Sequence, residues 1–177
     1  MGADERLRLF CALRLPGDVL DTIARWQARE LSGGRLVPRE HLHLTLAFLG
    51  SRPARDVEDV VGALRAVEAS GPMRFSLRGY RETRTVGMLV LHDETRNASL
   101  YADRLGERLE ILGVYEQQRR PWLPHVSVLR FRNRPGLRPA LPDLGECSPS
   151  DAALYNSVLR STGAQYVILE SVALGGT

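Results

Sequence analysis

The pattern of apolar and polar positions divides the chain into short strands and amphipathic helices. Apolar runs, some of which alternate with polar residues, end at glycine or proline turns, as β-strands do. They predict strands over residues 8–13, 41–49, 75–80, 86–91, 126–131, 152–159 and 165–174. Apolar residues that recur at intervals of three and four mark one face of a helix, and they predict helices across 19–26, 57–67 and 101–112.

The order of these elements favours an α+β fold with mostly antiparallel sheet. A doubly wound parallel sheet needs a helix between consecutive strands, and here most strands follow one another through short turns. The stretch 133–149 contains four prolines and two glycines and predicts an ordered surface loop. Because no linker or low-complexity tract interrupts the 177 residues, we expect a single domain.

Composition and charge narrow the class of protein. The 24 basic residues, all of them arginine, and the 21 acidic residues leave a net charge of +3. This net charge is too small for a protein that coats nucleic acid, although it allows a locally positive cleft for a phosphate-bearing ligand. Cys11 and Cys147 lack the spacing of a metal site and are expected to be buried free thiols. With neither a signal peptide nor an apolar run of membrane-spanning length, we expect a cytoplasmic monomer with no membrane contact.

Two strands carry the same chemical pattern. His43 precedes Thr45 by two residues, and His125 precedes Ser127 in the same way, so each imidazole shares a strand face with a hydroxyl. The repetition, one strand in each half of the chain, suggests an internal duplication. If the two strands meet at one cleft, one imidazole can accept a proton while the other donates one, because histidine titrates near neutrality. The hydroxyls would then donate hydrogen bonds to phosphate oxygens.

The extended motifs resemble those of a known family. Residues 43–48 read His-x-Thr-x-x-Phe and residues 125–130 read His-x-Ser-x-x-Arg, which resemble the paired motifs of the two-histidine phosphoesterases. The branch they most resemble comprises the bacterial and archaeal RNA 2′,3′-cyclic phosphodiesterases, first described as 2′–5′ RNA ligases. The resemblance extends to residues 9–16, 46–50, 120–125, 154–157 and 163–166. It implies a bilobal fold of two pseudo-symmetric lobes around a central cleft.

The resemblance also implies a reaction and a role for each motif residue. The substrate would be an RNA with a 2′,3′-cyclic phosphate end, or a small cyclic nucleotide, hydrolysed to a 2′-phosphate without metal or other cofactor. His43 would be the general acid that protonates the departing ribose O3′, and His125 the general base that activates water. Thr45 and Ser127 would contact the phosphate oxygens.

Two further motif residues complete the implied site. Arg130 would clamp the phosphate with its planar fork of donors, and Phe48 would stack on the terminal base. Each stands five residues after its histidine, an odd offset that places it on the opposite face of a regular strand. A bulge or the end of the strand must therefore turn each side chain toward the cleft. Tyr155 and Ser157 share a strand face and are additional candidates for the cleft.

Other chemistry remains open at this stage. The same site would join or cleave 2′–5′ RNA linkages if a ribose hydroxyl replaced water, and a binding module without turnover would also fit. His41, His43 and His125 offer the ligand types of a three-histidine zinc site. Arg119-Arg120 beside Trp122 could hold an RNA tail, or could be a solvated arginine pair next to a packed tryptophan.

Overall fold

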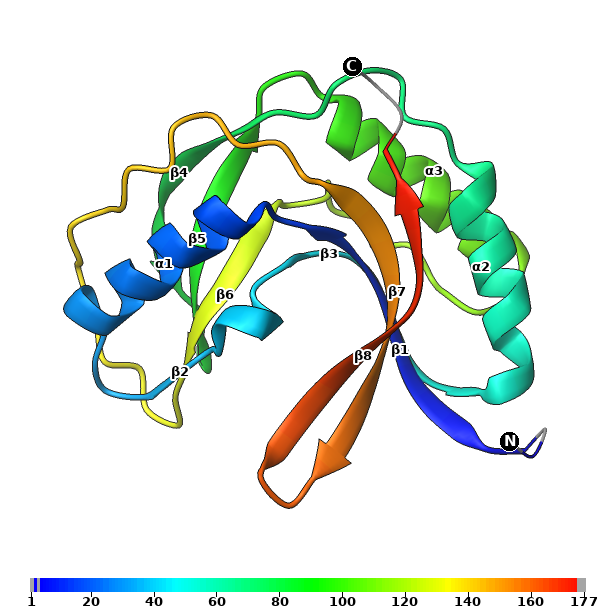
Figure 1. Cartoon of the computed structure of the whole chain (residues 1–177), viewed down its shortest axis with the longest axis horizontal. Helices are drawn as coiled ribbons and strands as arrows, with labels where there is room; N and C mark the ends of the chain where they lie inside the picture. Colours follow the sequence, from blue (N-terminus) through cyan, green and yellow to red (C-terminus); the bar gives the residue numbers. More distant parts are fainter. Residues whose placement is uncertain (1, 3, 175–177) are drawn as a thin grey trace.

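The computed structural model describes residues 2 and 4–174, and its strands form two antiparallel sheets (Figure 1). Sheet A has the strand order β3-β1-β7-β8 and sheet B the order β2-β6-β5-β4. The strands are β1 (Arg6–Arg14), β2 (Arg35–Leu36), β3 (Leu44–Pro53), β4 (Phe75–Glu82), β5 (Val86–Asp93), β6 (His125–Arg130), β7 (Asp151–Arg160) and β8 (Gly163–Ala173). The α+β fold with antiparallel sheet is therefore confirmed.

The helices expected from the apolar stripes are present and pack on the sheets. They are α1 (Gly17–Glu30), α2 (Val57–Ala66) and α3 (Asn97–Ile111). Figure 1 shows α1 beside β5 and β6, whereas α2 and α3 lie together against sheet A. The stripe of α1 is buried, and the Trp26 ring meets Tyr80 of β4 with centroids 6.3 Å apart. Within the described residues, no helix is long and apolar enough to cross a membrane.

The strand predicted over 41–49 begins later than expected. Pro38 precedes a 3-10 turn, η1 (Arg39–His41). In this turn the backbone N–H of His41 donates a hydrogen bond to the Pro38 carbonyl at 2.9 Å. His43 therefore lies just before β3 rather than inside it. The pattern of apolar residues could not reveal this turn, because a single turn of 3-10 helix is too short to show a repeat in the sequence.

The same strand also runs further than expected. Gly50, at which the strand was predicted to end, adopts a positive φ of 69° and pairs with Leu9 of β1. The pairing shifts by one residue beside it, so the glycine forms part of a β-bulge and β3 continues to Pro53.

The apolar interior is divided between the two faces of sheet A. The main core lies between the sheets and the helices and includes Trp26, Tyr101 and Phe75. A smaller cluster of Phe10, Ala12, Ala153 and Tyr155 lies on the opposite face, with Tyr166 packed against it. Both cysteines are buried free thiols, as expected.

The two sheets do not correspond to the two halves of the sequence. Sheet A takes β1 and β3 from the first half of the chain and β7 and β8 from the second. Sheet B likewise combines β2, β4 and β5 with β6. The strand after His43 therefore belongs to sheet A and the strand that begins at His125 belongs to sheet B, so each sheet contributes one histidine motif.

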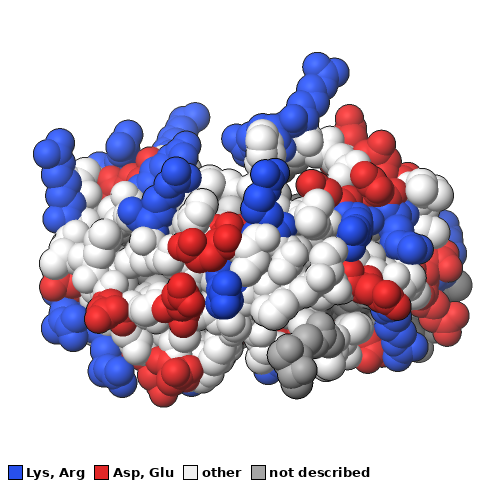
Figure 2. Space-filling view, turned by 90° about the horizontal axis from the view of Figure 1, so that it is seen from above, with Lys and Arg blue, Asp and Glu red and all other residues white. Residues whose placement is uncertain are grey.

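The surface carries mixed charge. Figure 2, a view from above Figure 1, shows arginine side chains projecting along one edge, with acidic side chains interspersed over the rest of that face. This distribution agrees with the net charge of +3. On this face an anionic ligand would therefore meet individual arginines among acidic side chains rather than a broad positive surface.

Candidate active site

Two hydrogen bonds fix the His43 ring. Nδ1 lies 2.7 Å from the carbonyl oxygen of His41, and Nε2 lies 2.9 Å from Thr45 Oγ1. A carbonyl oxygen only accepts, so the neutral ring carries its proton on Nδ1 and accepts the Thr45 hydroxyl at Nε2. Burial lowers the pKa of His43 to about 4, and positive charge on His125 and Arg130 acts in the same direction. His43 is therefore neutral, and its Nε2 accepts the Thr45 hydroxyl.

An aromatic shelf formed by Phe10, Tyr155 and Tyr166 buries His43. The Phe10 ring stacks on His43 with centroids 5.0 Å apart and on Tyr155 at 4.9 Å. Tyr166 meets both Phe10 and His43 edge-on, at 5.0 and 5.7 Å. Sequence analysis singled out Tyr155 but missed Phe10, because nothing in an apolar strand shows which face a phenylalanine occupies.

His125, the first residue of β6, is oriented in the same way as His43. Its Nδ1 lies 2.9 Å from the carbonyl oxygen of Leu123, two residues earlier, just as His43 bonds to the carbonyl two residues before it. Nδ1 is again the donor, which leaves Nε2 free for chemistry. Because i and i+2 positions of a strand share a face, Ser127 lies on the same side of β6.

A β-bulge turns Phe48 to the face of Thr45. Cys11 pairs with Ala47 and Ala12 with Thr45, so β3 contains an extra residue, Leu46, at this point. Leu46 and Ala47 are both buried, after which Phe48 returns to the other face with 49% of its surface exposed. This bulge explains the odd offset between His43 and Phe48.

A second bulge does the same for Arg130. Met88 of β5 pairs with Ser127 and Gly87 with Leu129, which leaves Val128 as the extra residue of β6. Val128 and Leu129 are both buried, and Arg130 is exposed on the face of Ser127. The expected bulge is thus present in both motif strands.

Two side chains donate hydrogen bonds to backbone carbonyls at these bulges; the sequence offered Trp122 only as a neighbour of a possible RNA-tail site and gave no such role to Gln27. Trp122 Nε1–H donates to the carbonyl of Thr45 at 3.0 Å, which ties the segment before His125 to β3. Gln27 of α1 is 2% exposed and its Nε2 donates to the carbonyls of Val128 at 2.8 Å and Val37 at 3.0 Å. A glutamine on the buried side of an amphipathic helix was the available signal for this role.

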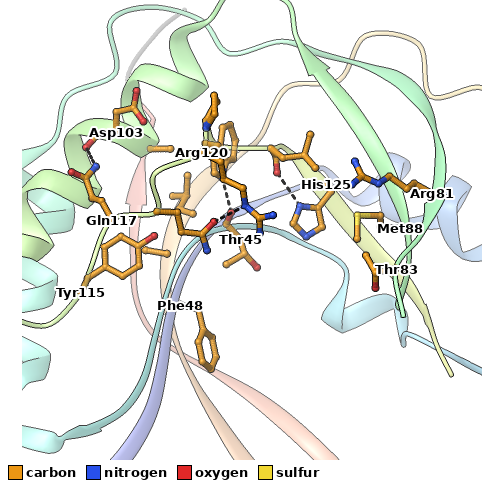
Figure 3. Close-up of a pocket in the computed structure, with 18 residues that line it drawn as sticks. Thr45, Phe48, Arg81, Thr83, Met88, Asp103, Tyr115, Gln117, Arg120 and His125 are labelled. Atoms are coloured by element: carbon orange, nitrogen blue, oxygen red, sulfur yellow. Dashed lines mark hydrogen bonds between the residues drawn. The ribbon is translucent and has the colours of Figure 1, made fainter. Parts of the chain in front are cut away.

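The two motif strands line one pocket of about 430 Å³. Figure 3 shows Thr45 and His125 near its centre, with Phe48 and Tyr115 to one side and Arg81 to the other. Other lining residues are Thr83, Met88, Gln117, Gln118, Arg120 and Trp122.

Three of the predicted site residues adjoin this pocket without lining it. His43 reaches it through the Thr45 hydroxyl, and Ser127 pairs in register with the lining residue Met88. Arg130 lies close enough to His43 to lower its pKa.

The sequence left Arg119-Arg120 open as either an RNA-tail site or a solvated arginine pair, and the structure places the two residues differently. Arg120 lines the pocket and its Nε donates to Gln118 Oε1 at 3.2 Å, whereas Arg119 is exposed and is not among the lining residues. Trp122 is half-buried and bonded to Thr45, so it braces the site as well as lining it.

The three-histidine zinc arrangement is not formed. The His41 ring stacks on Tyr166, with centroids 4.0 Å apart, rather than converging with the rings of His43 and His125. Over residues 2 and 4–174, no group of three His, Cys, Asp or Glu side chains is arranged to hold a metal ion.

Comparison with known proteins agrees with this geometry. Residues 13–81 match the family model described as LigT like phosphoesterase. The chain is 30% identical to an RNA 2′,3′-cyclic phosphodiesterase of Thermus thermophilus, over 96% of this chain and 91% of that protein. A protein of the same name from Methanocaldococcus jannaschii is 23% identical over 93% and 99% of the two chains.

Solved structures show the same fold. A crystal structure of a Thermus thermophilus protein superposes with a TM-score of 0.81 at 29% identity and covers 96% of this chain and 99% of its own. The structure of E. coli LigT complexed with phosphate has a TM-score of 0.78 at 23% identity, over 96% and 98% of the two chains.

Two antiparallel sheets, each with one His-x-hydroxyl motif, and a pocket lined by Thr45 of one motif and His125 of the other are typical of a two-histidine phosphoesterase. The chain belongs to the LigT-like phosphoesterase family, whose members include the RNA 2′,3′-cyclic phosphodiesterases that it matches over nearly its whole length.

Proposed function

We propose that this enzyme hydrolyses the 2′,3′-cyclic phosphate at an RNA end to a 2′-phosphate, without a metal ion. The observation that carries the proposal is that Thr45 and His125, one from each motif strand and each sheet, line a single pocket, with His43 hydrogen-bonded to Thr45 directly behind it. The relatives named for this reaction support it, since the chain matches them over nearly its full length.

The surroundings of the two histidines support different roles for them. His125 lines the open pocket, where a water molecule can approach its free Nε2, so it is suited to act as the general base. His43 lies behind Thr45 against the Phe10 ring, away from bulk water, so it is suited to protonate the departing ribose O3′. Water attacks phosphorus as the P–O3′ bond breaks, and the proton taken by His125 balances the proton given by His43.

The protonation of His43 is coupled to substrate binding. In the free enzyme burial keeps its pKa near 4, so the ring is neutral at physiological pH. A phosphodiester anion placed against Nε2 favours the imidazolium form and raises this pKa, because an opposite charge nearby stabilises the charged ring. The substrate therefore brings in the negative charge that lets His43 act as an acid.

The remaining motif residues bind the substrate. Thr45 and Ser127 donate hydroxyl hydrogen bonds to the non-bridging phosphate oxygens, and Arg130, turned into position by the β6 bulge, pairs with their negative charge. Phe48 offers an exposed ring on the pocket wall on which a base of any identity can stack. These contacts supply positive charge and hydrogen-bond donors that do not depend on a metal ion.

The test is product identity from a short RNA that ends in a 2′,3′-cyclic phosphate, incubated with excess EDTA. The wild type should release only the 2′-phosphate, whereas His43→Ala and His125→Ala should each lose at least about a thousandfold in rate. Loss of wild-type activity in EDTA with recovery on adding zinc would contradict the metal-independent mechanism. Turnover by the double variant that lacks both histidines would contradict the residue assignment.

A further inference from the structure

The short strand β2 places a second arginine beside Arg130. Arg35 pairs in register with Arg130, and Leu36 with Leu129. Directly opposed residues of an antiparallel pair point to the same face, with Cβ atoms about 5 Å apart. Leu129 is buried in the main core and Leu36 packs against it, so Arg35 and Arg130 point to the other face, which His125 and Ser127 share.

Within residues 2 and 4–174, this pair of arginines has no acidic partner. Both side chains are exposed, and neither is in an ion pair with an acidic side chain of the described residues. Like charges directly opposite each other destabilise an antiparallel pair. An anion bound at this position would relieve the repulsion.

The backbone holds Arg35 firmly against β6. A Cβ atom added to Gly34 would lie 2.4 Å from the Arg130 carbonyl oxygen, so only glycine permits this close approach. Gly33 has a positive φ of 83°, which turns the chain into β2. The pairing continues past β2, where Val37 N–H donates to the Val128 carbonyl at 3.1 Å. Arg35 is therefore carried on a fixed strand rather than on a loose loop.

The two arginines stand at different distances from the reacting groups. Arg130 contributes to the low pKa of His43 and of His41, whereas Arg35 is not among the charges that act on either ring. Since β2 is the edge strand beyond β6, Arg35 lies one strand spacing, about 4.8 Å, further out on the sheet. Arg130 thus faces the reacting phosphate, and Arg35 faces whatever anion lies next to it.

We propose that Arg35 binds the phosphate on the 5′ side of the terminal nucleotide, and so favours RNA ends over free cyclic nucleosides. This inference rests on the proposed function, because that function places the cyclic phosphate between the histidines. In an RNA chain the adjacent anion is the next phosphodiester, and Arg35, whose guanidinium is always charged, presents a planar fork of donors to it.

Binding of two unreactive ligands tests the proposal independently of turnover. Adenosine 2′-phosphate and adenosine 2′,5′-bisphosphate differ only in the 5′-phosphate, and calorimetric titration gives a dissociation constant for each. The wild type should bind the bisphosphate about tenfold more tightly or better, because a charge-assisted hydrogen bond is gained. Arg35→Gln should lose this preference and leave the affinity for the monophosphate unchanged.

Matched variants separate a specific effect of Arg35 on the bisphosphate preference from a general effect of removing positive charge. Arg108→Gln removes an exposed arginine from the last turn of α3 and should keep the full preference, whereas Arg130→Gln should weaken both ligands. A wild type that binds both ligands equally, or an Arg35→Gln enzyme that retains the preference, would overturn the proposal. If the bisphosphate preference depends on Arg35 but cyclic phosphate ends are not hydrolysed, the second phosphate site stands and the proposed reaction fails.

Discussion

At the scale of single residues, the site depends on how two imidazoles are held. Each histidine donates Nδ1–H to the carbonyl two residues before it, which leaves Nε2 as the nitrogen without a proton in both neutral rings. They differ in their surroundings, since Phe10 stacks on His43 whereas His125 lines the open pocket. The two chemically identical side chains are therefore suited to two different proton transfers, one as the base and the other as the acid.

The depressed pKa of His43 has a consequence for stability. Its pKa is about 4 in the folded protein, against an ordinary value of 6.5, so between these values the unfolded chain binds more protons. The histidine therefore costs the native state stability as the pH falls from 6.5 to 4, by roughly 3 kcal/mol when complete. Urea unfolding of the wild type and His43→Gln at pH 6.5 and 4.5 measures this cost. An equal loss of stability in both proteins would contradict it.

The two hydroxyls should contribute less to the rate than the two imidazoles. Thr45→Ala and Ser127→Ala each remove one donor to the phosphate, which predicts a loss in kcat of about a hundredfold. Thr45 also bonds His43 Nε2 in the free enzyme, so Thr45→Ala should be the more harmful of the two. Rates on a cyclic-phosphate RNA end give the comparison, and a hydroxyl variant as slow as the histidine variants would count against these roles.

At the scale of elements, the β-bulges of β3 and β6 decide which side chains reach the site. Each bulge buries two successive residues and returns Phe48 or Arg130 to the face of the preceding hydroxyl. Trp122 and Gln27 donate to carbonyls at these bulges from neighbouring segments. The face that carries the motif side chains therefore depends on side chains from outside the two motif strands.

Removing the Gln27 amide should affect both stability and phosphate binding. Gln27→Leu removes the side-chain donor to the Val37 carbonyl and leaves the Val128 carbonyl with only the Val37 N–H, which should cost about 1–3 kcal/mol of unfolding free energy. The relaxed bulge should also weaken binding of adenosine 2′-phosphate as Arg130→Gln does.

A control separates this effect from general loosening of the fold. Arg29→Gln, at an exposed position in the last turn of the same helix, should change neither quantity. Full phosphate affinity in a destabilised Gln27→Leu protein would show that the amide supports the fold alone.

The sequence predicted the elements in which apolar residues repeat at a regular interval, and it missed the features that depend on contacts between distant segments. Helical stripes and alternating strands follow from local spacing, and the His-x-hydroxyl pairs follow from the two-residue repeat of a strand. The 3-10 turn that ends at His41 has no such repeat, and Gln27 acquires its role only when α1 meets β6. The bulges were required by the offsets of Phe48 and Arg130, but their positions became visible only with the strand register.

At the scale of the whole molecule, each sheet combines strands from both halves of the chain, so connecting segments must cross from one sheet to the other. The predicted loop 133–149 is ordered because it is anchored at several points on its way from β6 to β7. Trp26 Nε1–H donates to the Ala140 carbonyl at 2.6 Å, and Cys147 forms a two-way bridge with Phe75. The loop is therefore anchored to α1 and to β4 of sheet B before the chain enters β7 of sheet A.

A buried carboxylate provides the strongest anchor of this loop. Glu82 accepts the Tyr80 hydroxyl at 2.7 Å and the backbone N–H groups of Gly136 and Leu137 at 2.8 and 3.1 Å. These bonds, together with Arg134, outweigh burial and lower the pKa of Glu82, so its contribution to stability is present at neutral pH and is lost as acid protonates it.

Replacing this carboxylate should release the loop. Glu82→Gln should speed amide hydrogen exchange at residues 134–138 at neutral pH, while exchange in β1 and β7 stays slow. Arg138→Gln, which changes an exposed residue of the same loop, should leave exchange unchanged. Unchanged protection of 134–138 in Glu82→Gln would mean that the other anchors suffice.

The assignment of His43 as the general acid and His125 as the general base is tested most directly by changing the leaving atom. In an RNA end whose cyclic phosphate carries sulfur in place of the bridging O3′, the departing thiolate needs no proton, so the general acid becomes dispensable. With this substrate His43→Ala should approach the wild-type rate, while His125→Ala should remain slower by orders of magnitude. Recovery of His125→Ala instead would exchange the two roles, and recovery of neither would contradict acid–base catalysis by this pair.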